Sequence, residues 1–261
     1  MLNLLKADLF RFLKTKIVYI SLIVAVGLPL FMAGVYALTN VGVSAEEAEG
    51  FKVVYGNMLF TGTFSNLLSF GFVFAIFPVI VIMMDFGNGT IRNKIIHGYT
   101  RHQIFAAHFI ITCVYVLILT ALYTLTTDVC ALLMFKVGEF DTASLAFFFI
   151  IGFVSTLLSA SIGCCLALSL ANAGSIILTI VCKLLFDNIY LIAFLIFNAN
   201  GAGESQVAKH VLSFFPCYVT GLLGNAIIEP VMFVEALVGV FIISGGFYAL
   251  GTFVFNKRDF K

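Results

Sequence analysis

The sequence has few charged residues and few prolines, and it has no tryptophan. Of its 261 residues only 10% are charged and 4 are prolines, whereas 62% are hydrophobic and the mean hydropathy is +1.13. Water-soluble chains are roughly 45–50% apolar and about 25% charged. The composition therefore excludes a soluble domain and predicts an integral membrane protein. A net charge of +1 gives no indication of a nucleic-acid partner, and none is expected.

The chain also lacks the motifs of common nucleotide and catalytic sites. It has no G-x-x-x-x-G-K-[ST] loop for phosphates, no H-E-x-x-H and no G-x-S-x-G. Its 6 cysteines form no C-x-x-C spacing, so neither a metal site nor a disulfide framework is predicted. We expect no catalytic residues, no metal and no enzymatic activity in this chain.

What the chain does have is a series of long apolar runs. A helix needs about 20 apolar residues to cross the hydrocarbon core, so the length allows about six spans. We predict a single all-α membrane domain over residues 1–261, with spans at Ile17–Leu38, Phe60–Met84, Ile104–Leu125 (helical to Met134), Ala143–Leu170, from the turn at Ala171–Gly174 to Phe197, and Val231–Phe255. Residues 39–57 are predicted to form an acidic outer loop.

Residues 1–16 show helical spacing of apolar side chains opposite Asp8, Arg11 and Lys14. This pattern predicts an interfacial helix, with Lys6 and Lys16 reaching lipid headgroups. The alternative is that these residues begin a longer first helix.

Residues 198–230 are polar at first and then apolar, and Pro216 interrupts the apolar part. They are either a seventh span or a pair of short helices that dip into the outer leaflet. We favour the pair, because a seventh span would carry the basic C-terminus to the outer side.

The basic residues favour one orientation. Ten lie on the predicted inner side: Lys6, Arg11, Lys14, Lys16, Arg92, Lys94, Arg101, Lys257, Arg258 and Lys261. Three lie on the outer side: Lys52, Lys136 and Lys209. Since cytoplasmic loops carry the excess of lysine and arginine, both termini are predicted to be cytoplasmic.

The loop at residues 85–103 carries the most local structural signals. Gly87 and Gly89 end the preceding helix, and Thr90 is predicted to cap a short helix with Ile91 and Ile95 on one face. Gly98 closes that helix, and Thr100 with Gln103 forms a capping box for the next span. The alternative is an ordinary basic loop between two spans.

The segments Gly89-Thr90-Ile91-Arg92 and Gly98-Tyr99-Thr100-Arg101 resemble the loop between spans two and three of type-2 ABC (ABC-2) exporter permeases. Tyr99 departs from the family, where proline is common, and His108 stands near a usual lysine. The resemblance implies that the short helix couples the chain to an ATPase. The implied coupling residues are Thr90, Ile91, Arg92, Asn93, Lys94, Ile95, Gly98 and Arg101. The resemblance also implies a re-entrant hairpin at residues 198–230.

The same resemblance implies the assembly. Two copies of a separate ATPase subunit would bind ATP and Mg, a second permease would be identical or homologous, and this chain would hold no cofactor. The layout is similar to small six-span permeases of the bacterial cytoplasmic membrane. These export, or give immunity to, antimicrobial peptides such as bacitracin and lantibiotics, so an amphipathic or lipid-like substrate is expected.

A second polar feature lies within the predicted spans. Lys183 and Asp187 are one helical turn apart, with Asn188 beside them. They are either an internal pair that locks the helix in place or a polar spot on a substrate path or subunit interface. A gradient-driven secondary transporter or channel would use such a spot without an ATPase, and this is the alternative function.

Overall fold

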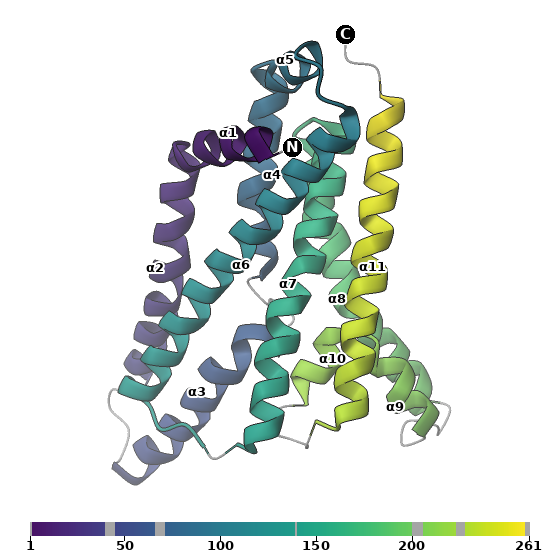
Figure 1. Ribbon diagram of the computed structural model, residues 1–261. Helices are drawn as coiled ribbons and strands as arrows, with labels where there is room; N and C mark the ends of the chain where they lie inside the picture. The colour runs from purple at the N-terminus through teal and green to yellow at the C-terminus, as the bar shows by residue number, and fades with distance from the viewer. Residues whose placement is uncertain are drawn as a thin grey trace.

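The computed structural model describes residues 2–39, 45–65, 71–138, 140–199, 206–222 and 228–258, and within them every regular element is an α-helix. Figure 1 shows long helices side by side, with α1 and α5 at one end of the bundle. The helices are α1 (Leu2–Leu13), α2 (Lys16–Thr39), α3 (Ala45–Ser65), α4 (Gly71–Gly87), α5 (Thr90–Ile96), α6 (Arg101–Met134), α7 (Thr142–Leu170), α8 (Gly174–Ala199), α9 (Gln206–Ser213), α10 (Pro216–Gly221) and α11 (Pro230–Lys257).

The predicted all-helical class is confirmed, and its long apolar helices are compatible with a multi-pass membrane protein. Among the described residues, four helices are long and apolar enough to cross a membrane: α2, α6, α7 and α11. A fifth is added if α4 and α5, which meet at a bend of 63°, are counted as one broken span. In α8 the apolar stretch Gly174–Phe186 is shorter than these.

Most predicted boundaries agree with the structure to within a few residues. The helix predicted to continue to Met134 does so, and α7 and α11 begin and end where the apolar runs do. The separate α1 shows that the alternative of one long first helix is wrong. The region 198–230 contains the two predicted short helices, and Pro216 begins α10 because proline suits the first helical turn.

One prediction about residues 39–57 is wrong. The predicted outer loop is helical from Ala45 onward, because alanine and glutamate favour helix and acidic side chains favour its N-terminal end. The predicted second span, Phe60–Met84, covers the end of α3 and most of α4, and residues 66–70 between them lie outside the described residues, so the span stays a prediction.

Helix α7 is the centre of the packing, since α4, α6, α8 and α11 all contact it. Small residues make this possible. A Cβ at Gly163 of α7 would stand 3.0 Å from Val79 Cγ2 of α4, and one at Gly251 of α11 would stand 3.0 Å from Cys165 Sγ of α7. Small residues at helix contacts are usual where helices pack in a membrane.

Candidate functional site: a buried charge cluster beneath α5

Helix α5 is set apart from its neighbours by two left-handed glycines. Gly89 has a φ of 67° and Gly98 a φ of 87°, a conformation that costs glycine little. Gly89 is the N-cap of α5, so the predicted capping role of Thr90, which is the first helical residue, is wrong. The capping box of α6 is confirmed: Gln103 N–H donates to Thr100 Oγ1 at 3.3 Å, and Thr100 N–H donates to Gln103 Oε1 at 3.2 Å.

The predicted apolar face of α5 turns toward the protein itself. Ile91 is 1% exposed and packs in a core with Ile82, Ile104 and Phe105, and Ile95 lies against the same core. The exposed apolar residue is Ile96, at 71%. Ile91 is therefore covered by the bundle and Ile95 is half-buried against it, whereas Arg92, Asn93 and Ile96 are exposed.

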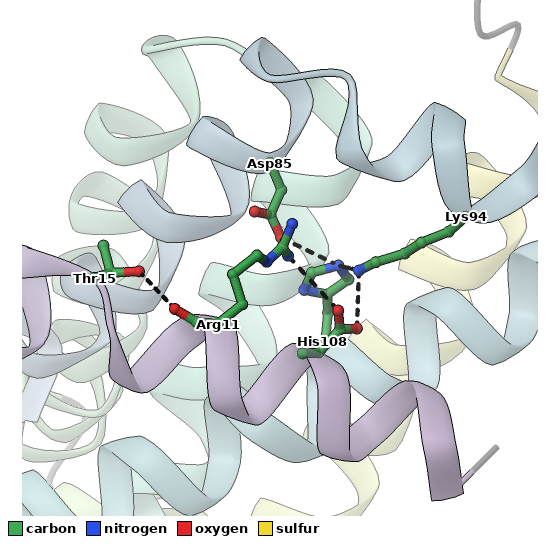
Figure 2. Close-up of polar contacts among 6 residues, drawn as sticks. Arg11, Thr15, Asp85, Lys94 and His108 are labelled. Carbon is green, nitrogen blue, oxygen red and sulfur yellow. Dashed lines mark hydrogen bonds and ion pairs between the residues drawn. The ribbon is translucent and has the colours of Figure 1, made fainter.

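Lys94 is also turned inward, and it enters a cluster of five ionisable side chains from four helices. These are Asp8 and Arg11 of α1, Asp85 of α4, Lys94 of α5 and His108 of α6. Figure 2 shows the side chains of Arg11, Asp85, Lys94 and His108 converging. All except Arg11 are buried. Lys94, one of the implied coupling residues, therefore has its ammonium group inside the protein beside Asp8.

The cluster is neutral as a whole. Lys94 Nζ lies 2.8 Å from Asp8 Oδ2, and Arg11 contacts Asp85 directly while standing 3.6 Å from Asp8 Oδ1. Two cations thus face two carboxylates. Burial lowers the pKa of Lys94, and the hydrogen bond to Asp8 opposes that shift.

His108 takes part as a neutral acceptor. Its Nε2 lies 3.1 Å from Lys94 Nζ, and an ammonium group only donates, so Nε2 accepts and the ring proton resides on Nδ1. Asp85 Oδ2 is 3.7 Å from the same Nε2, too far for a hydrogen bond. The cluster thereby joins α1, α4, α5 and α6 through buried polar contacts.

A groove of about 270 Å³ lies beside the cluster, between α1 and α5. It is lined by Leu4, Ala7, Asp8, Arg11, Thr90, Asn93, Lys94, His97 and Tyr99. Residues of both α1 and α5 therefore line one groove.

Arg101, another predicted coupling residue, is used to bind the end of α11. Its Nη1 donates to the carbonyl oxygens of Asn256 and Arg258, each at 2.6 Å. Arg258 Nη1 in turn donates to Ser169 O at 3.0 Å, and its guanidinium lies 5.1 Å from the Phe86 ring centroid. These arginines satisfy carbonyl groups at the ends of α7 and α11, which helices leave without intrahelical donors.

The predicted polar spot on α8 is described only in part. Lys183 is buried, at 3% exposed, and Asn188 Nδ2 donates to Leu184 O at 2.7 Å. The side chain of Asp187 lies outside the described part of the structure. The pairing of Lys183 with Asp187 stays a prediction.

Sequence reasoning missed Asp8, Asp85 and His108 as site residues. One signal was present: Leu4, Asp8 and Phe12 follow one another at i, i+4, i+8, so a carboxylate stands in the middle of a buried stripe. It also missed a second cluster, in which Glu235 of α11 accepts from His210 Nδ1 at 2.8 Å and from Ser213 Oγ, both on α9.

Within the described residues, no three His, Cys, Asp or Glu side chains come together as a metal site would require. No family model and no curated protein matches the chain. The function is therefore argued from the residues and their geometry.

Proposed function

We propose that this chain is the membrane-spanning subunit of an ATP-driven exporter of the ABC-2 type, and that its ATPase docks on α5. The observation that carries the proposal is the construction of α5. It is a short helix between two left-handed glycines, and its buried side contacts α1, α4 and α6. Arg92, Asn93 and Ile96 lie on its exposed side. The resemblance of residues 89–101 to the coupling loop of the family supports it further.

A partner that pushes on α5 would move other helices with it. Lys94 connects α5 to Asp8 of α1 and to His108 of α6, while Arg11 connects α1 to Asp85 of α4. These contacts are buried, so separating them would leave charges without partners, which is costly. Closure of an ATPase dimer on α5 would thus reach the spans as a concerted displacement of four helices.

The proposed topology has six spans, formed by α2, by α3 and α4 together, and by α6, α7, α8 and α11, with both termini in the cytoplasm. The distribution of exposed charge supports it. Lys6, Lys14, Lys16, Arg92 and Lys257 are exposed in elements that meet at the α5 end of the bundle (Figure 1). In this topology α9 and α10 form the outer hairpin.

The proposed complex contains two copies of the ATPase, which bind ATP and Mg, and a second permease, identical or homologous. It lies in the cytoplasmic membrane of a bacterium and exports an antimicrobial peptide or another amphipathic, lipid-like molecule. The support for this substrate class is the family resemblance of the loop at residues 85–103.

Extraction from a bacterial host in mild detergent tests the proposal. We expect the chain to be recovered with a nucleotide-binding protein, and Ile96→Asp to reduce that association about tenfold or more, because the aspartate would lose water on docking. Val207→Asp is the matched control, since Val207 is 69% exposed but lies on α9, and it should leave association unchanged.

Equal recovery of the ATPase with both variants would show that α5 is an ordinary loop helix. Transport by the purified chain alone would overturn the exporter proposal in favour of a gradient-driven transporter.

A further inference from the structure

Helix α1 has two different faces. Its buried face packs on the bundle and consists of Leu4, Asp8 and Phe12, which are 3–7% exposed. Its outer face combines apolar and basic side chains: Leu9, Phe10 and Leu13, which are 40–63% exposed, together with Lys6 and Lys14. Lys16, at the start of α2, is exposed next to them.

The charge of this outer face follows from the cluster described above. Asp8 is the single acidic residue of α1, and it is turned inward and bonded to Lys94 at 2.8 Å. The outer face therefore carries lysines and no acidic residue of α1. Lys14 Nζ stands 4.2 Å from the centroid of the Phe10 ring, so cation and apolar surface are directly adjacent.

We propose that the outer face of α1, formed by Lys6, Leu9, Phe10, Leu13, Lys14 and Lys16, binds anionic phospholipids. The apolar side chains would contact acyl chains, and the lysine stems would extend along them to place the ammonium groups among phosphates. Zwitterionic headgroups offer the same apolar contact but no net charge, so the lysines select anionic lipid.

The inference rests on the proposed membrane location of the chain and does not depend on an ATPase partner. The proposed lipid-binding face also differs from the general excess of basic residues on the inner side of a membrane protein. The selectivity arises because the Asp8–Lys94 pair removes from the surface the one charge of α1 that would repel phosphate.

The test uses the full chain reconstituted in bilayers of phosphatidylcholine with spin-labelled phosphatidylglycerol or phosphatidylcholine as probe. We expect the protein to associate with phosphatidylglycerol in preference to phosphatidylcholine. The triple variant Lys6→Gln, Lys14→Gln, Lys16→Gln should lower this preference on the order of fivefold or more, since each lysine near a charged surface contributes. Raising the salt concentration should weaken the preference of the wild type.

The matched control is Lys6→Arg, Lys14→Arg, Lys16→Arg, which changes the same positions but keeps the charges and should keep the preference. Lys52→Gln, an exposed lysine of α3, should also leave it intact. Because all three α1-face positions are exposed, thermal unfolding should be unchanged and will confirm that each variant is folded. Equal lipid preference in the glutamine and arginine variants, or no preference in the wild type, would overturn the inference. Binding of an acidic protein in place of lipid would overturn it as well.

Discussion

The buried pair of Lys94 and Asp8 offers the sharpest test of how α5 is connected to the bundle. Lys94→Met removes the ammonium and keeps a side chain of similar length, so Asp8 loses the partner at 2.8 Å and keeps Arg11 at 3.6 Å. Asp8→Leu produces the opposite defect and leaves a buried ammonium beside His108. Each single variant should therefore be strongly destabilised.

The expected size follows from the burial of both groups, which are 5% and 8% exposed. Removing one member of a buried ion pair costs about 3–5 kcal/mol. The double variant Asp8→Leu, Lys94→Met removes both charges and leaves Arg11 with Asp85, so the cluster stays neutral. It should lie within about 1 kcal/mol of the wild type, because well-packed apolar residues replace buried ion pairs at little cost.

The wild type, the two single variants and the double variant form a double-mutant cycle. Unfolding by SDS in mixed micelles, followed by circular dichroism, measures the stability of all four. We expect a coupling energy of at least about 5 kcal/mol between the two positions, because two single effects of about 3–5 kcal/mol each would almost vanish in the double variant. Arg92→Met, on the exposed side of α5, is the control and should change stability by no more than about 0.5 kcal/mol. Additive effects in the double variant, or single variants as stable as Arg92→Met, would refute the pairing.

Two further predictions concern the outer helices and the topology. Gly239→Ala should destabilise the protein by about 1–3 kcal/mol, because a Cβ there would overlap the carbonyl oxygen of Phe214, whereas Gly245→Ala meets open space and should be neutral in the same unfolding assay. Single cysteines at Lys52 and Arg92, in a background without the 6 native cysteines, should be labelled from outside and from inside respectively, since both positions are exposed. Labelling of both from the same side of intact cells would contradict the proposed orientation.

The sequence by itself determined the helical class and most helix boundaries. Signals such as the capping box at Thr100 and Gln103 act within one turn, so neighbours in sequence are enough to place them. The same is true of the break at Gly89, which depends only on local backbone freedom. The helix that begins at Ala45 was not foreseen, because the acidic residues there are as typical of an outer loop as of the first turn of a helix.

Only the tertiary structure decided which side of α5 is buried. Ile91, Ile95 and Ile96 lie around more than one side of a helix of 7 residues, so apolar spacing alone does not choose among them. Packing against Ile104 and Phe105 buries Ile91 and leaves Ile96 exposed.

The charge cluster depends on the tertiary structure for the same reason. Asp8 and Lys94 are 86 residues apart, and Arg11 and Asp85 are 74 residues apart, so no periodicity in the sequence relates them. The sequence predicts Arg11 and Lys94 only as basic residues of the inner side. The fold turns the four residues into two ion pairs, because a charge within the bundle is stable only beside an opposite charge or a hydrogen-bonding group.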